Sequence, residues 1–287
     1  MIIDFHTHTF PDAIAEKTIA YLTEKGGIKP YREGTLSSLI ENMRQSGVDV
    51  SVALPVVTNP RQERTVNRVS RENNGKNNVY FAGGIHPDSE NFNETLDTIK
   101  SSGLFGIKLH PDYQGVHFDD PRYLRIMRGA FERGLYVITH AGWDIAYPDH
   151  LHCSPDMVLN VLKELKGLAD NRLILAHLGG YEMPDEVLQK LVGAPVYMDT
   201  AAVLRLYPEK CREIILRHGA DKILFASDSP WDSQKDYIEI LKSFRLGEEA
   251  ERRGGPGAGA VLLPGGGGSG KHDLADGSAA GPKGGAA

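Results

Sequence analysis

Two histidines near the amino terminus are spaced so that they could bind a metal together. His6 and His8 lie two residues apart in an apolar, strand-like segment, residues 1–9. Successive side chains of a strand point to opposite faces, so these two imidazoles project from the same face. Imidazole is the commonest protein ligand for metals, although a histidine pair in a strand can equally be structural. The rest of the chain must supply further ligands if this pair binds a metal.

Side chains of the ligand type also follow later apolar segments. Such segments end at, or just before, His86, His110, His140, His177 and Asp228. Imidazole and carboxylate together suit Zn²⁺, with Mn²⁺ or Fe²⁺ as alternatives, and an incomplete protein shell leaves a position for water. The pattern predicts a catalytic metal site, provided that the fold brings these segment ends together.

The segments that carry these residues alternate between strand-like and helix-like patterns. Strands are predicted at residues 1–9, 48–57, 78–84, 104–110, 135–140, 172–177, 195–200 and 222–226. Helices are predicted at residues 11–25, 35–45, 60–73, 93–101, 121–133, 155–165, 184–191, 208–218 and 234–244. Strands that are apolar throughout indicate a parallel sheet covered on both faces. Eight strand–helix units predict an α/β fold, a closed (β/α)₈ TIM barrel. The alternative is a doubly wound open sheet, which usually carries a Gly-rich phosphate loop that this sequence lacks.

A closed barrel would bring the strand ends together at one mouth, where catalysis takes place in this fold. Side chains of one parity in each strand should point into the barrel. The predicted inward sets are Asp4, His6 and His8; Gly106, Lys108 and His110; Tyr136, Ile138 and His140; Leu173, Leu175 and His177; and Leu224, Ala226 and Asp228. Each set ends at a residue that could take part in the site.

The composition limits the class of partner. A formal net charge of -6 argues against a general nucleic-acid or anionic-membrane binder and favours a small-molecule substrate. Cys153 and Cys211 have no CxxC spacing, which suits a reducing compartment. No secretory signal or membrane span is visible, so we expect a cytoplasmic protein. The sequence leaves open whether it forms a homo-oligomer.

The composition changes abruptly near residue 250. Residues 1–250 carry the barrel pattern, whereas residues 251–287 are rich in Gly, Ala and Pro. Such a segment cannot bury enough apolar surface to offset its chain entropy. We predict a disordered tail, or a segment produced by a frameshift in the coding sequence.

The ordered set of motifs resembles the amidohydrolase superfamily. The stretches GIKLHPDYQG, HAGWD, LILAHLGGY and LFASDSPW are similar to its amidohydrolase-related branch, which also contains aminocarboxymuconate-semialdehyde decarboxylase. The resemblance covers residues 1–246. It implies that a divalent metal, Zn²⁺ in the first place, is bound by His6, His8, His140 and Asp228. It also implies that His177 polarises the substrate or orients a water, whose proton Asp228 could accept.

Lys108 has several interpretations. In some binuclear amidohydrolases a carboxylated lysine on the fourth strand bridges two metals, and Lys108 is similar in position. An unmodified lysine would instead bind an acidic substrate or support the surrounding residues. We favour one metal ion over two.

Other residues could bind a second metal or the substrate. His86 and His110 would line the pocket, although each precedes Pro-Asp and could be structural in a turn. The remaining candidates are Trp143 and Asp144, after the fifth strand, and Arg61 and Arg205, which could clamp a carboxylate or simply be solvated.

The sequence therefore supports three hypotheses. The first is a metal-dependent amidohydrolase-type hydrolase that uses a metal-activated water on a C–N or C–O bond of a small molecule. The second is a metal-dependent nonoxidative decarboxylase of a small carboxylic acid. The third is a barrel that binds a metal or ligand without turnover.

Overall fold

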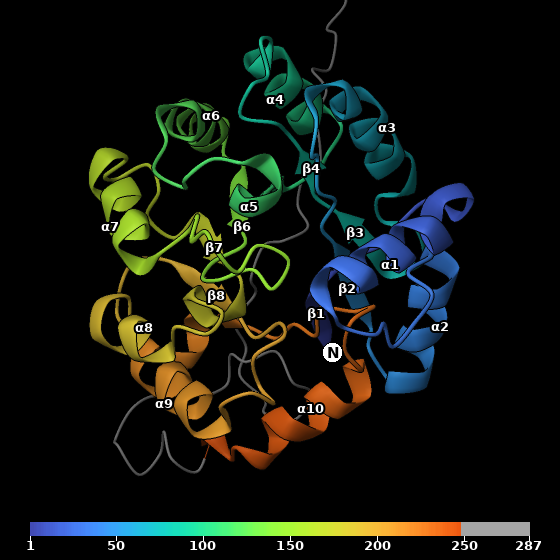
Figure 1. Ribbon diagram of the computed structural model, residues 1–287, viewed down its shortest axis with the longest axis vertical. Helices are drawn as coiled ribbons and strands as arrows, with labels where there is room; N and C mark the ends of the chain where they lie inside the picture. The colour runs from blue at the N-terminus through green and yellow to red at the C-terminus, as the bar shows by residue number, and fades with distance from the viewer. Residues whose placement is uncertain (248–287) are drawn as a thin grey trace, which may run out of the picture.

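Parallel strands form a closed ring in the computed structural model, which describes residues 1–247 (Figure 1). The predicted tail at residues 251–287 lies outside the described residues. The strands are β1 (Ile3–Thr7), β2 (Val50–Ala53), β3 (Val79–Phe81), β4 (Gly83–Gly84), β5 (Gly106–Leu109), β6 (Tyr136–Thr139), β7 (Leu173–Leu175), β8 (Tyr197–Asp199) and β9 (Ile223–Leu224). They pair in sequence order, as β1–β3 and β4–β9.

Two junctions complete the ring. β3 and β4 are one barrel strand interrupted at Ala82, whose N–H donates to the carbonyl of Ala53 at 3.1 Å. β9 lies beside β1, because the N–H of Phe5 donates to the carbonyl of Phe225 at 2.8 Å. The eight predicted strands and the TIM barrel are thereby confirmed.

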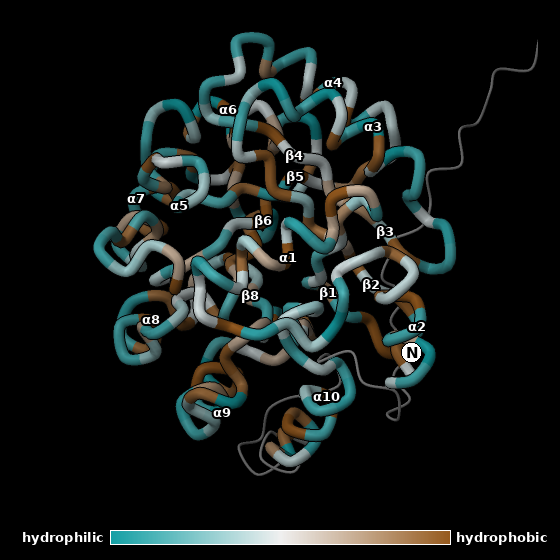
Figure 2. The backbone as a smooth tube through the Cα atoms, turned by 45° about the vertical axis from the view of Figure 1, so that its right-hand side comes forward, coloured by the Kyte–Doolittle hydropathy of each residue, from teal (hydrophilic) through white to brown (hydrophobic). Residues whose placement is uncertain are grey.

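Eight helices form the outer layer around the strands (Figure 1). They are α2 (Leu36–Ser46), α3 (Glu63–Asn73), α4 (Phe92–Ser101), α6 (Pro121–Glu132), α7 (Pro155–Glu164), α8 (Pro184–Lys190), α9 (Pro208–His218) and α10 (Gln234–Ser243). Several begin at the hydroxyl caps expected of helix starts; Ser154, for example, accepts a hydrogen bond from the N–H of Met157. Hydrophobic stretches of these helices alternate with hydrophilic ones along the tube in Figure 2. Within residues 1–247, no helix has both the length and the apolar character needed to cross a bilayer.

Two further helices lie in loops that follow strands. α1 (Asp12–Gly26) follows β1 and contributes several residues to the wall of the cleft at the barrel mouth. α5 (Pro111–Gln114) follows β5 and was not predicted, because one turn of helix is too short to show a periodic pattern. The connections within residues 1–247 also contain four short 3₁₀ turns, at Pro60–Gln62, Lys76–Asn78, His177–Gly179 and Ala220–Lys222.

The inside of the barrel corrects part of the predicted alternation. Ile174 packs with Val52, Leu54 and Ile138 in the inner cluster, whereas Leu173 and Leu175 belong to the larger core that includes the helices. The predicted parity of β7 is therefore wrong. His177 nevertheless reaches the mouth, because the chain leaves the strand before it and enters a turn with a φ of 59°.

The predicted inward position of Asp4 is also wrong. Its buried carboxylate accepts hydrogen bonds from Ser227 N at 3.0 Å and from Gln234 Nε2 at 2.8 Å. Gln234 is the first residue of α10, so its hydrogen bond to Asp4 links β1 to the outer layer of helices. A register shift between Asp4 and Thr7 reverses the alternation before His6. Burial raises the pKa of Asp4 to about 6.

Candidate metal centre at the barrel mouth

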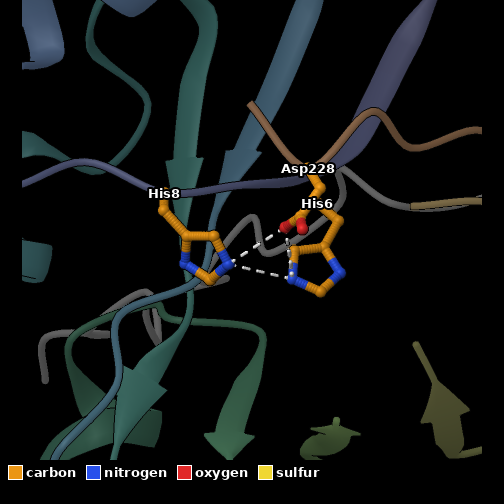
Figure 3. Close-up of side chains that lie close together, drawn as sticks. All are labelled: His6, His8 and Asp228. Atoms are coloured by element: carbon orange, nitrogen blue, oxygen red, sulfur yellow. Dashed lines mark hydrogen bonds and ion pairs between the residues drawn. The ribbon is translucent and has the colours of Figure 1, made fainter. Parts of the chain in front are cut away.

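His6, His8 and Asp228 point toward one another at the carboxyl ends of their strands (Figure 3). The Nε2 atoms of His6 and His8 are 3.1 Å apart. Asp228 Oδ1 lies 3.3 Å from Nε2 of His8 and 3.6 Å from Nε2 of His6. The structure thus brings the predicted histidine pair to the aspartate that ends the eighth barrel strand.

The hydrogen bond that Nδ1 of each imidazole makes determines which ring nitrogen carries the proton and which carries the lone pair. Nδ1 of His8 donates to the carbonyl of Leu54 at 2.9 Å, and Nδ1 of His6 donates to Asp199 Oδ2 at 2.8 Å. Both Nε2 atoms therefore present lone pairs, to each other and to a carboxylate oxygen. That repulsion is relieved by a cation bound between them. The donor set fits a divalent metal, with both histidines held by a second partner as metal-binding histidines usually are.

Asp199 is a functional residue that the sequence reasoning missed. Besides accepting from His6, its carboxylate accepts the backbone N–H groups of His177 and Ala201, each at 3.0 Å. It is fully buried at the end of β8. Its position at a strand end, like that of the ligands, was the signal that could have identified it.

Replacing Asp199 with asparagine should weaken metal binding by about 10–100-fold, the usual cost of removing such a supporting partner. Asparagine can still accept from the two backbone groups, but its NH₂ would face Nδ1 of His6 and favour the wrong tautomer. Competition with a chelator would measure the change. Asp232→Asn, on the same cleft wall, is the control; equal affinities for the two variants would contradict the assigned role of Asp199.

His177 and Asp228 share an unusual backbone conformation. Both have positive φ, 59° and 68°, although neither is glycine. Residues held in this region cost free energy and occur preferentially at functional sites. The N–H of Asp228 donates to the carbonyl of His6 at 3.0 Å, which fixes the carboxylate beside the histidine pair.

His140 pairs with His177 rather than with His6 and His8. Nδ1 of His140 lies 3.0 Å from Nε2 of His177. The other nitrogens donate to carbonyls, Nε2 of His140 to Trp143 and Nδ1 of His177 to Ala201. The facing nitrogens therefore need one further proton, or a cation, between them. As a possible ligand, His140 groups with His110 and Asp144, so its predicted role as a fourth ligand of the first site stays a prediction.

Burial keeps three histidines of the site neutral. It lowers the pKa of both His140 and His177 to about 4, and it lowers the pKa of His6 well below its usual value. Burial alone would raise the pKa of Asp228, but the adjacent imidazoles hold it well below its usual value. At neutral pH these three imidazoles are neutral and the Asp228 carboxylate is ionised, the forms that bind metals.

Lys108 also lies in the site. Its Nζ is 3.3 Å from Nε2 of His6, and the side chain is almost fully buried. Burial lowers the pKa of Lys108 to about 8. The structure thus places Lys108, the only lysine among the predicted site residues, beside His6.

The site opens into a cleft of about 1560 Å³. Its aromatic lining includes Tyr21, Tyr113, Trp143, Tyr147, Tyr181 and Trp231. Nζ of Lys25 lies 3.6 Å from the centroid of the Tyr147 ring and joins α1 to the loop after β6. The cleft is larger than the about 300–1,000 Å³ usual for a small-molecule site, but it has the lining of such a site, mostly apolar and aromatic with a few polar groups.

The model of a protein family described as Amidohydrolase matches residues 3–254. The chain belongs to the amidohydrolase family. A search of curated proteins found no match.

Solved structures with the same fold include hydrolases and decarboxylases. A probable 2-pyrone-4,6-dicarboxylic acid hydrolase from Acinetobacter baumannii has a TM-score of 0.60 and 17% identity, covering 87% of this chain and 94% of its own. 2,6-Dihydroxybenzoate decarboxylase from Rhizobium has a TM-score of 0.63 and 15% identity, covering 86% and 94%. 5-Carboxyvanillate decarboxylase from Sphingomonas paucimobilis has a TM-score of 0.59 and 16% identity, covering 87% and 95%. At these identities the likeness establishes the fold alone.

The other predicted site residues of this amidohydrolase are divided between the cleft and its surroundings. His110, Trp143, Asp144, Arg61 and Arg205 all line the cleft. Arg205 forms ion pairs with Asp232 at 3.3 Å and Asp236 at 2.7 Å, so its guanidinium already binds two carboxylates of the protein. His86 is absent from the lining, and its Nδ1 accepts the N–H of Asp88 at 3.2 Å, as in the turn that was the alternative interpretation.

Proposed function

We propose that this amidohydrolase is a metal-dependent hydrolase of a C–N or C–O bond in a small molecule. The observation that carries the proposal is the convergence of His6 Nε2, His8 Nε2 and Asp228 Oδ1 at the mouth of an open cleft. Three protein ligands are typical of catalytic zinc sites, which keep a position for water or substrate. Zn²⁺ is the expected ion, with Mn²⁺ or Fe²⁺ as alternatives.

A divalent ion held there would polarise a substrate oxygen and lower the pKa of a water to about 7. The protein's own residues would move the protons. Asp228 accepts a proton at its carboxylate, which faces the position between the two histidines. Neutral His177 keeps its proton at Nδ1, on the carbonyl of Ala201, so its Nε2 lone pair would accept a hydrogen bond from the attacking water and orient it.

Lys108 favours a second candidate function, the nonoxidative decarboxylation of a small carboxylic acid. In the charged form its buried ammonium, 3.3 Å from His6 Nε2, would bind a substrate carboxylate next to the metal ligands. Both reactions use the same residues. Two of the similar folds named above are decarboxylases, which is compatible with this alternative.

The two candidates differ in what becomes of water. Metal-loaded protein would be incubated in H₂¹⁸O with panels of small lactones, amides and aromatic carboxylic acids. Hydrolysis would place ¹⁸O in the product, and mass spectrometry would detect it. Release of CO₂ without ¹⁸O in the organic product would overturn the hydrolase in favour of the decarboxylase. Equal turnover by protein stripped with a chelator would overturn both metal-dependent reactions.

A further inference from the structure

α3 turns two apolar side chains away from the core of the barrel. The residues that it buries are polar, namely Glu63, Asn67 and Ser70. Val66 and Val69 are only partly buried, and both line the cleft. Within residues 1–247 neither valine packs against a hydrophobic core cluster. An outer helix of a globular protein ordinarily turns its apolar stripe to the core, so these two valines lack their usual partner.

α1 presents a second apolar face to the same cleft. Of its 15 residues, only Ala15 and Ile19 are buried. Ile14 and Leu22 line the cleft with Thr18, which is four residues from each, so the three side chains lie on one side of the helix. Leu22 is only partly buried, and within residues 1–247 it packs against neither core cluster. The cleft therefore has apolar walls on both α1 and α3.

Exposed apolar side chains are concentrated at this cleft. Residues 1–247 have nine large apolar side chains that are exposed, and five of them line the cleft: Ile14, Tyr21, Ile28, Ile145 and Leu206. Exposed apolar surface gathered at one place is a mark of ligand-binding grooves and of protein interaction sites. The cleft also exceeds the usual volume of a small-molecule site, which leaves room for a substituent beyond the reacting group.

One small molecule can reach both the metal centre and these apolar walls. A single cleft is lined by the group His6, His8 and Asp228 and by the side chains of α1 and α3. Leu22, Val66 and Val69 are half-buried within a concave surface, which an alkyl chain can enter more readily than the surface of a second protein can. Binding would remove apolar surface of both the chain and the cleft from water.

We propose that Leu22, Val66 and Val69 form an apolar arm of the cleft that binds an alkyl chain of the substrate. The substrate class is then an ester or amide of an alkyl carboxylic acid. Hydrolysis of such an ester breaks the acyl C–O bond, takes up one water and gives the acid and the alcohol. The bond that is cleaved rests on the proposed function, whereas binding of the alkyl chain does not.

The test is the binding of straight-chain carboxylates, from acetate to decanoate, to the zinc-loaded full chain. The carboxylate is the product of the proposed hydrolysis, so its head group belongs at the metal centre and its chain in the apolar arm. Each methylene buried in the arm should tighten binding by about fourfold. Isothermal titration calorimetry would measure the affinities, with a stoichiometry of one carboxylate per chain.

Two variants make the apolar arm polar without touching the metal ligands. Val69→Thr keeps the shape of its side chain, and Leu22→Ser shortens the side chain on α1. Each should weaken decanoate binding by about 5–150-fold, because binding would desolvate the new hydroxyl. Acetate should bind both variants as it binds the wild type, because it does not extend into the arm. Leu159→Ser is the matched control, since Leu159 is 38% exposed on α7 and lies outside the cleft lining.

An affinity that does not depend on chain length would overturn the apolar arm, and so would an equal loss of decanoate binding in Leu159→Ser. A dimer that Leu22→Ser converts to a monomer in sedimentation velocity, without chain-length dependence, would assign this surface to a second copy and also overturn it. Chain-length-dependent binding without hydrolysis of any ester or amide in the panels would support the arm and contradict the proposed function. Metal-dependent hydrolysis of p-nitrophenyl esters at rates independent of acyl length, with equally independent binding, would support the hydrolase and overturn the arm.

Discussion

Replacing His8 with alanine should remove the metal from the first site and abolish turnover. The variant loses one of two facing Nε2 ligands, leaving His6 and Asp228 as the remaining pair of that group. Loss of a ligand should cost more than the approximately 10–100-fold loss of affinity that follows removal of a supporting partner. Chelator competition would measure the affinity, and turnover of any substrate found in the panels would measure the catalytic effect.

His117→Ala is the matched control for this variant. His117 is an exposed histidine outside the cleft lining, so its removal should change neither metal affinity nor turnover. His8 is also partly exposed. Within residues 1–247 its imidazole makes one described hydrogen bond to the backbone, to the carbonyl of Leu54, and alanine keeps the backbone N–H that donates to Ser229 O, so the fold should survive the truncation. A His8→Ala protein that binds zinc as tightly as the wild type would contradict the first metal site.

The convergence of His6, His8 and Asp228 could be predicted because topology determines where strand ends lie. Parallel strands of a closed barrel all end at one mouth, so His6, His8 and Asp228 meet although more than 200 residues separate them in the chain. The inward or outward parity of a residue within its strand was less decisive for reaching the mouth than the position of the strand end. His177 reaches the mouth from a strand whose parity was predicted wrongly, because a turn with positive φ re-aims it.

The supporting residues could not be predicted in the same way. The role of Asp199 depends on which nitrogen of His6 it contacts, and that is a matter of side-chain geometry. The pairing of His110 with Asp112 depends on the single helical turn after β5, which leaves no periodic pattern in the sequence. His86 shows the converse, since this histidine after a strand lies outside the cleft lining and its Nδ1 accepts the N–H of Asp88 in its own turn.

The loop that carries Trp143 and Asp144 is fixed by one glycine, and its substitution gives the second large prediction. Gly142 has a φ of 90°, and a Cβ there would lie 2.1 Å from the backbone nitrogen of Tyr181 and 2.4 Å from its oxygen. On either side of it, Tyr181 N donates to Ala141 O at 2.8 Å and Trp143 N donates to Tyr181 O at 3.1 Å. The loops after β6 and β7 thus approach each other too closely for residue 142 to carry any side chain.

Gly142→Ala should therefore lower the free energy of unfolding by about 2–5 kcal/mol, the sum of left-handed strain and backbone overpacking. Gly167→Ala is the control, because Gly167 has a similar φ of 81° but no atom within 4 Å of its added Cβ. That variant should lose only about 1–2 kcal/mol, from strain alone. Urea denaturation of the two variants would measure both losses, and equal losses would contradict the close approach of the loops.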